Sequence, residues 1–249
     1  MARIDDLLSD ALRRVGQKPP DNVSASVKKR YSELISQAVA NAFAEELRQR
    51  GLATARPAPP GEVDRSGAER RMSGGIGAKK VDVTWATEES GLLLAISIKS
   101  INFRDRSSGT YQKNLTNRRG DMLFEAVTLH RRFPYAVLAG FFILDYQARD
   151  DHTGRRRSTF ENAHHKLRLF TGRADPAGRD EQFERLYVVL LDAKPEQPRF
   201  LAYLAGHPEQ PVPLEQIFDE LIELVAERDP DFYEVENGRL IRVRPPTAY

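Results

Sequence analysis

Three side chains in the first half of this sequence have types and spacing that could do chemistry, namely Asp82, Ser97 and Lys99. Asp82 lies in one predicted strand, while Ser97 and Lys99 lie two residues apart, and therefore on one face, of the next. A lysine at the end of an apolar run is costly to bury unless a carboxylate or a bound phosphate compensates its charge. The sequence therefore predicts that Lys99 meets an acid or a phosphate.

These residues belong to a predicted hairpin over 79–101, KKVDVTWATEESGLLLAISIKSI. Its first strand alternates apolar and polar residues, with Asp82 on the face opposite Val81, Val83 and Trp85. Residues 88–91 form a polar turn, and 92–98 is an apolar run short enough for a strand buried on both faces. The hairpin is expected to bring the acid and the lysine face to face.

Asp82 followed by Ser97-Ile98-Lys99 resembles the PD-(D/E)xK nuclease superfamily, which has the restriction-endonuclease-like fold. In that family the aspartate and the first acid of the triplet bind a divalent metal, and the lysine positions or activates the attacking water. The chain departs from the pattern twice, since Val81 stands in place of the proline and Ser97 in place of the acid. The resemblance covers roughly residues 46–144.

The resemblance implies that a helix following the lysine strand supplies the missing acid, as in some restriction enzymes similar to this family. Glu125 or Asp121 is the expected substitute, and the insertion 102–115 accommodates the 26 residues between Lys99 and Glu125. Glu46 lies within the apolar face of the preceding predicted helix, where an acid is more often a partly exposed edge residue. The resemblance makes Glu46 the candidate for a further catalytic acid.

The resemblance also implies a reaction, which is metal-dependent hydrolysis of phosphodiester bonds in double-stranded DNA. Asp82 and either Glu125 or Asp121 would hold Mg²⁺, with Mn²⁺ as a substitute, since hard oxygen ligands suit these ions. Lys99 would orient the water and stabilise charge, and Ser97 would hydrogen-bond a metal-bound water. A type II restriction enzyme or a phage-defence nuclease of the prokaryotic cytoplasm is expected, as a homodimer or with a partner subunit.

The charge of the chain is distributed unevenly. Its 249 residues carry a net charge of +2, but residues 99–173 hold 15 Lys and Arg against 7 Asp and Glu. Such an excess is expected of a face that meets a phosphate backbone, although a solvated surface would look similar. The expected nucleic-acid contacts are Lys79, Lys80, Arg104, Arg106, Lys113, Arg118, Arg155, Arg156 and Arg157.

Other features of the composition exclude several classes of protein. The chain has no cysteine, so it has neither a disulfide framework nor a thiolate zinc site. No apolar run approaches the roughly 20 residues that span a bilayer, and the charged first residues do not suggest a signal peptide. We therefore expect a soluble intracellular protein without a membrane partner.

The elements that would position the site follow an α/β order. Helices are predicted over 2–15, 21–51, 116–133, 159–170 and 213–227, and further strands over 135–144, 186–191 and 199–204. The expected fold is a restriction-endonuclease-like αβββαβ core, with a mixed central sheet flanked by helices. The core domain would span 21–205, with a helical extension at 1–20, and a C-terminal helix and an Asn237-Gly238 hairpin at 206–249.

Two alternatives to a nuclease remain open at this stage. The same fold with a degenerate site would bind nucleic acid without cleaving it, and Ser97 would mark the lost chemistry. In an unrelated α/β protein, Asp82 and Lys99 would be a cross-strand ion pair with a purely structural role. An acid at Glu125 favours the nuclease over the first alternative, and the basic segment after Lys99 favours it over the second.

Overall fold

A five-stranded mixed sheet forms the centre of the chain. The computed structural model describes residues 3–59, 70–73, 78–174 and 176–243, with only the backbone described for 70–73 and 78–79. The strand order is β3 (Val83–Thr87), β4 (Gly91–Ile101), β5 (Val137–Asp145), β6 (Arg185–Asp192) and β7 (Arg199–Leu204). Strands β4, β5 and β6 are parallel, whereas the edge strands β3 and β7 pair antiparallel. The predicted α/β class and mixed sheet are confirmed.

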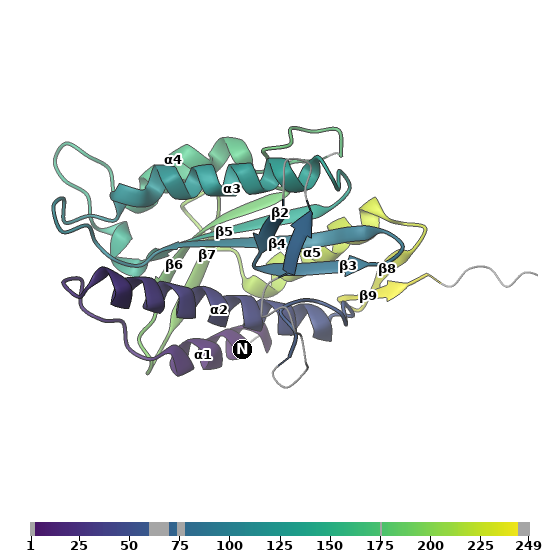
Figure 1. The fold of residues 1–249 in the computed structure, drawn as a ribbon, viewed down its shortest axis with the longest axis horizontal. Helices are drawn as coiled ribbons and strands as arrows, with labels where there is room; N and C mark the ends of the chain where they lie inside the picture. The colour runs from purple at the N-terminus through teal and green to yellow at the C-terminus, as the bar shows by residue number, and fades with distance from the viewer. Residues whose placement is uncertain (1–2, 60–69, 74–77, 175, 244–249) are drawn as a thin grey trace, which may run out of the picture.

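Helices cover both faces of this sheet (Figure 1). One face packs against α1 (Arg3–Val15), α2 (Ala25–Gln49) and α5 (Leu214–Arg228), and the other against α3 (Leu115–His130) and α4 (Thr159–Leu167). Short 3₁₀ helices lie at η1 (Gln112–Asn114), η2 (Tyr146–Arg149) and η3 (Arg168–Phe170). Two small hairpins complete the elements, β1 (Arg70–Ser73) with β2 (Ala78–Val81) and β8 (Tyr233–Glu236) with β9 (Arg239–Arg242).

The two terminal segments pack on the same core as the sheet. The apolar stripe of α1, Ile4, Leu8 and Leu12, is buried with residues of α2 and α5. The predicted Asn237-Gly238 turn joins β8 to β9 with positive φ at both residues, as a type I′ turn requires. None of the described helices is long and apolar enough to cross a bilayer.

Alternation along β4 divides its side chains between the two helical layers. Leu94, Ile96 and Ile98 belong to the core beneath α2, whereas Ala95 and Ile101 pack under α3. Ser97 and Lys99 have the same parity as Ala95, so they point toward α3. The polar residues of this strand therefore face the helix that carries Glu125.

The predicted continuous strand through Asp82 is wrong in one respect. Asp82 lies in a bend between β2, which pairs with β1, and β3, which pairs with β4. Val81 therefore packs in the α3-side core, while Val83 lies in the core beneath α2. The bend frees the Asp82 carboxylate from the pleat of a regular strand.

Gly140 of β5 determines how closely α3 approaches the sheet. A Cβ atom at this position would lie 2.6 Å from Met122 Cε and 2.5 Å from Leu186 Cδ1, so a larger residue would push against both. Gly140 is the register partner of Ser97 on β4. Met122 precedes Glu125 by about one helical turn, so close packing at Gly140 places Glu125 above Ser97.

A buried charge cluster around Glu184 fixes the opposite end of the sheet. Arg173 Nη1 donates to Glu184 Oε1 at 3.0 Å, Arg228 Nη1 lies 2.7 Å from the same oxygen, and the Leu138 amide donates to Oε2 at 2.7 Å. His130 Nε2 is 3.4 Å from Oε2. Burial opposes ionisation, but these partners together keep the pKa of Glu184 below its ordinary value.

Glu184→Gln should lower the free energy of unfolding by about 3–5 kcal/mol, because it leaves two buried guanidinium groups without a counter-charge. Asp10→Asn, which removes an exposed partner of Arg13, is the control and should change it by less than about 1 kcal/mol. The depressed pKa means that the stabilisation is present above the ordinary carboxyl pKa and is lost as pH falls through the folded value. Urea unfolding at pH 7 measures both variants, and equal losses would contradict the cluster's role.

Candidate active site

The ammonium of Lys99 lies between two carboxylates that come from different elements. Its Nζ atom is 3.0 Å from Glu125 Oε2 on α3 and 3.6 Å from Asp82 Oδ2 at the sheet edge. Lys99 also donates to Ser97 Oγ at 3.1 Å, and Ser97 Oγ donates to the same Glu125 oxygen at 3.2 Å. The four residues that the sequence singles out at this position therefore converge.

Glu125 is the acid that the structure places over the strand, and it is only 4% exposed. Its Oε2 atom accepts from Ser97 and Lys99, whereas its Oε1 atom is buried and has no hydrogen-bond partner among the described residues. Buried carboxylate oxygens are normally satisfied, so an unpartnered one indicates a place for a further donor or a cation. Glu125 thus contacts Ser97 and Lys99 through Oε2, and it is not among the residues that line the cleft described below.

Asp82 is held against the backbone of β4. β3 begins at Val83, opposite Ile96, so among the described residues no strand pairs with the part of β4 beyond Ile96 on that edge. Asp82 Oδ2 accepts from the amide of Ile98 at 2.7 Å and so takes the place of a strand bond. This contact fixes the carboxylate beside Lys99.

The charge on Lys99 is maintained by its neighbours. Burial disfavours the ammonium, but the fields of Glu125 and Asp82 and the hydrogen bond to Glu125 outweigh it and raise the pKa of Lys99 above its ordinary value. Lys99 is therefore an ammonium at neutral pH and a hydrogen-bond donor to Ser97. A protonated lysine does not serve as a base that would turn Ser97 into a nucleophile.

Asp121 does not take the position of the displaced acid. Its side chain is 54% exposed and pairs with Arg118 at 3.4 Å, one turn closer to the start of α3. Its charge also raises the pKa of Lys99, but by less than the charge of Glu125 does. Of the two acids that the sequence left as alternatives, only Glu125 contacts Ser97 and Lys99.

Glu46 does not lie with the site residues, and its proposed catalytic role is not supported. Its Oε1 atom accepts from Arg3 at 2.7 Å and from Arg50 at 2.5 Å, and its Oε2 atom from Arg3 at 2.8 Å. Arg50 also bonds to Asp219 of α5. Burial opposes ionisation, but the two arginines keep the pKa of Glu46 below its ordinary value. Glu46 joins α1, α2 and α5 in a structural ion-pair cluster.

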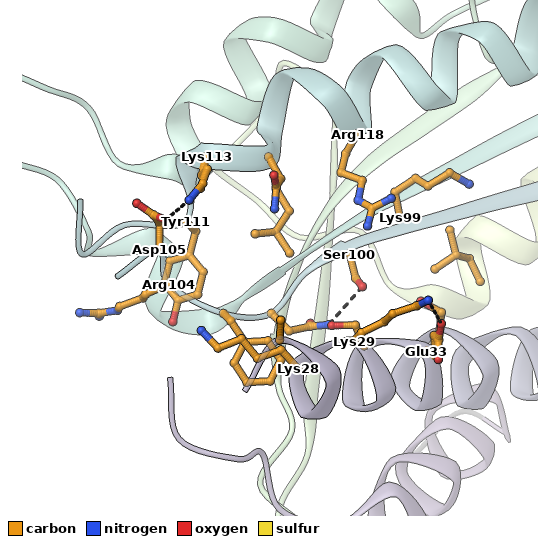
Figure 2. A pocket seen from close by; sticks show the side chains of 18 of the residues that line it. Lys28, Lys29, Glu33, Lys99, Ser100, Arg104, Asp105, Tyr111, Lys113 and Arg118 are labelled. Atoms are coloured by element: carbon orange, nitrogen blue, oxygen red, sulfur yellow. Dashed lines mark hydrogen bonds and ion pairs between the residues drawn. The ribbon is translucent and has the colours of Figure 1, made fainter. Parts of the chain in front are cut away.

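A cleft of about 1220 Å³ opens beside Asp82 and Lys99 (Figure 2). One wall is α2 from Ala25 to Ala40, and the other consists of the end of β4, the segment 102–114 and the first turn of α3. Cationic side chains predominate in its lining: Lys28, Lys29, Lys80, Lys99, Arg104, Arg106, Lys113 and Arg118. Only three acids line it, namely Glu33, Asp82 and Asp105.

Five of the predicted nucleic-acid contacts line this cleft, namely Lys80, Arg104, Arg106, Lys113 and Arg118. Arg155, Arg156 and Arg157 are not among its lining residues, and Arg156 donates to Asp151 O and Thr110 Oγ1. The side chain of Lys79 lies outside the described residues.

Lys28 and Lys29, which project from α2 in Figure 2, are cleft residues that the sequence analysis missed. The apolar stripe of α2 predicts a helix, but the sequence of its polar face does not indicate that this face lines a cleft. The Lys-Lys pair one turn after the cap Ser24 was the available signal.

Two loops contact one another at the end of the cleft farthest from Asp82. Lys18, before α2, pairs with Asp145 at 2.7 Å, and Tyr111 donates to the other Asp145 oxygen at 3.0 Å. Arg106 donates to the carbonyl groups of Asn22 and Val23. These contacts hold the segment 102–114 against the start of α2, so both walls of the cleft keep a fixed spacing.

No protein-family model, curated protein or solved structure matches the chain. The candidate site therefore rests on the geometry of its own residues.

Lys99→Met should lower the free energy of unfolding by about 2–4 kcal/mol at pH 8, because it leaves Asp82 and Glu125 close together without their cation. A loss should be seen at pH 5 as well, because wild-type Lys99 is also an ammonium there. The raised pKa means that the wild-type ammonium stabilises the fold at every pH below its ordinary value and is lost only as pH rises through the folded value. Urea unfolding at the two pH values measures the difference.

Lys113→Met is the matched control, because it removes a lysine whose side chain is 67% exposed and which pairs with Asp105. It should change stability by less than about 1 kcal/mol at either pH. A Lys99→Met protein as stable as this control would mean that Asp82 and Glu125 do not depend on the ammonium.

Proposed function

We propose that the chain is a metal-dependent nuclease that hydrolyses phosphodiester bonds. Its active site would consist of Asp82, Ser97, Lys99 and Glu125. The observation that carries this proposal is the convergence of Asp82, Glu125 and Lys99 beside a cleft whose charged lining residues are mainly cations. An acid pair, a charged lysine and a basic groove are what hydrolysis of a polyanion requires. A structural ion pair requires no such groove.

The residues present fit a divalent cation bound largely through water and substrate. Within the described residues no group of three His, Cys, Asp or Glu side chains could hold a metal. Mg²⁺, however, keeps several waters and commonly binds through one or two carboxylates, and Asp82 and Glu125 would provide them. The unpartnered, buried Oε1 atom of Glu125 supports this assignment. When bound, the cation would provide charge neutralisation and a more acidic water.

The charge of the site also favours a divalent cation. The ammonium of Lys99 pairs with two carboxylates, Asp82 and Glu125, so these three groups together carry one net negative charge. A phosphodiester is itself negative, so this group alone would repel it. One divalent cation changes the net charge to positive and makes phosphate binding favourable.

The residues of the chain then have separate roles. Lys99 donates a hydrogen bond to the attacking water or to a phosphoryl oxygen and stabilises the negative charge that develops there. Ser97 fixes both Lys99 and Glu125 through its hydroxyl group. Asp82, held by the Ile98 amide, and Glu125, held by Ser97, are kept in place before substrate arrives.

The finer fold assignment belongs to the same proposal. Along the chain α2 is followed by the β1–β2 hairpin, β3, β4, α3 and β5, an order similar to the αβββαβ core of PD-(D/E)xK enzymes if the hairpin takes the place of the first strand. The serine at the triplet and the glutamate on α3 would then be the variant in which a helix supplies the acid. DNA is the proposed substrate, and a restriction or defence role, a homodimer and a partner subunit remain part of this hypothesis.

Glu125→Gln should reduce cleavage of DNA in Mg²⁺ by about 100-fold or more, as should Asp82→Asn, because each removes a charge at the reacting phosphate. Asp121→Asn is the matched control one turn away and should retain most of the activity. EDTA should abolish wild-type cleavage, and Mn²⁺ should restore it. Gel assays of labelled DNA measure the rates.

Activity that survives EDTA would rule out the proposed chemistry. If Glu125→Gln kept full activity and Asp121→Asn lost it, Asp121 and not Glu125 would be the catalytic acid on α3. Binding without hydrolysis under every metal condition would support the degenerate-site alternative.

Lys28→Ala/Lys29→Ala should weaken DNA binding and reduce its dependence on salt, because both lysines line the cleft and phosphate contacts release counterions. Neutralising Arg155 and Arg157, exposed arginines outside the cleft lining, is the comparison and should have a smaller effect. Binding isotherms at several salt concentrations measure both. A larger effect at Arg155 and Arg157 would place the nucleic acid on another face.

A further inference from the structure

The two walls of the cleft differ in chemistry, and this difference bears on the form of its ligand. The wall made by β4, the segment 102–114 and α3 presents Lys99, Arg104, Arg106, Lys113 and Arg118 with Asp105 as its acid. Lys113 and Ser107 keep the pKa of Asp105 below its ordinary value, so this acid is ionised and neutralises part of the wall. This wall nevertheless carries at least three more cations than acids.

The α2 wall is mostly neutral and rich in hydrogen-bonding groups. Lys28 and Lys29 lie toward its N-terminal end, and Lys29 pairs with Glu33 at 3.8 Å. Beyond them come Ser32, Ser36 and Gln37. In the described part of the chain, Ser36 Oγ and the Gln37 amide have no hydrogen-bond partner, so both are available to a ligand.

The base of the cleft between these walls has a preorganised polar contact and an aromatic ring. Asn102 Nδ2 donates to Ser32 Oγ and to Ser100 Oγ, each at 3.1 Å, so it connects α2 to the end of β4. Phe103 is half-buried, its ring makes a T-shaped contact with Tyr31, and the ammonium groups of Lys18 and Lys28 lie 5.2 Å and 5.4 Å from its centroid. An accessible aromatic ring flanked by cations is a stacking platform for nucleobases.

We infer that the cleft binds an unpaired nucleic-acid strand, with phosphates along the β4–α3 wall and bases toward α2 and Phe103. A single strand has one anionic edge and one neutral, hydrogen-bonding edge, which matches the two walls. A duplex presents phosphates on both of its outer edges, whereas Lys28 and Lys29 stand only toward one end of the α2 wall and, among the described residues, no cation lines this wall beyond them. This inference rests on the proposed function and specifies the substrate class of the same site.

The dimensions of the α2 wall agree with several nucleotides. From Ala25 to Ala40 the helix rises about 22 Å, at 1.5 Å per residue. At a stacked spacing of about 3.4 Å this accommodates about six nucleotides of one strand. Phe103 lies beside Tyr31 and Lys28, so the stacking platform is near the N-terminal end of this wall.

The test uses the full chain carrying Glu125→Gln, so that binding is measured in Mg²⁺ without hydrolysis. A fluorescein-labelled 20-nucleotide DNA strand is compared with the same strand in a duplex by anisotropy. The single strand should bind about tenfold or more tightly. Equal or tighter binding of the duplex, or no binding of either, would overturn the inference.

Three further variants in the Glu125→Gln background assign the effect to the cleft. Phe103→Leu should weaken single-strand binding by about tenfold, because base stacking on an aromatic ring is lost. Gln37→Ala should weaken it several-fold while leaving the fold intact, since this side chain is exposed. Phe232→Leu, at an exposed aromatic residue outside the cleft lining, is the control and should have no effect. Equal effects of Phe103→Leu and Phe232→Leu, with no effect of Gln37→Ala, would overturn the assignment.

The outcome for the proposed function is separate. Wild-type protein that prefers the single strand but hydrolyses neither form in Mg²⁺ or Mn²⁺ would retain the substrate inference and contradict the nuclease proposal. Wild-type protein that cleaves DNA and prefers the duplex would retain the nuclease proposal and contradict the substrate inference.

Discussion

An ammonium inside an apolar sheet needs anionic partners, and the arrangement of the site follows from this requirement at Lys99. Burial opposes its charge, and the two carboxylates that offset burial come from separate elements, Asp82 before β3 and Glu125 on α3. Each carboxylate is itself fixed by a neighbour on β4, Asp82 by the Ile98 amide and Glu125 by Ser97. The site is thus a closed set of contacts centred on one strand.

The open edge of β4 explains why this set lies where it does. The pairing of β3 with β4 ends at Ile96, and in the described part of the chain the Asp82 carboxylate, at the bend, accepts from the Ile98 amide where a paired strand would. The same interruption leaves Ile98 to Ile101 to line the cleft. A shortened edge strand therefore creates both the carboxylate position and the access to it.

Local patterns in the sequence were sufficient to predict much of this region. The turn at 88–91 and the apolar run after it predict the β3–β4 hairpin, and the parity of Ser97 and Lys99 predicts their common face. The resemblance to a nuclease family pointed to a helix acid, but 3.6-residue periodicity alone did not separate Glu125 from Asp121, since both share a helical face. Packing of α3 on Gly140 makes that distinction, and it depends on a contact between distant segments.

Other features depended on contacts between distant segments that a single sequence does not encode locally. In the sequence Glu46 is an acid on the apolar face of a predicted helix. Only the hydrogen bonds from Arg3 and Arg50 show that it belongs to a structural ion-pair cluster. Lys28 and Lys29 resemble ordinary solvated lysines until the segment 102–114 is found opposite them. The αβββαβ core, the metal and the reaction remain proposals that the sequence resemblance first suggested.

The missing Cβ at Gly140 makes the identity of three positions interdependent. With Met122 resting on the glycine, the helix carboxylate reaches the strand, and the strand position itself needs only the small hydroxyl of Ser97. A side chain at 140 would lift the helix, and a long acid at 97 would occupy the space that Glu125 fills. Positions 97, 125 and 140 should therefore show epistasis, so that a substitution tolerated at one depends on the residues at the other two. In descendants of this chain the acid could move from position 125 on α3 to position 97 on β4 only if the distance between α3 and the sheet changed as well.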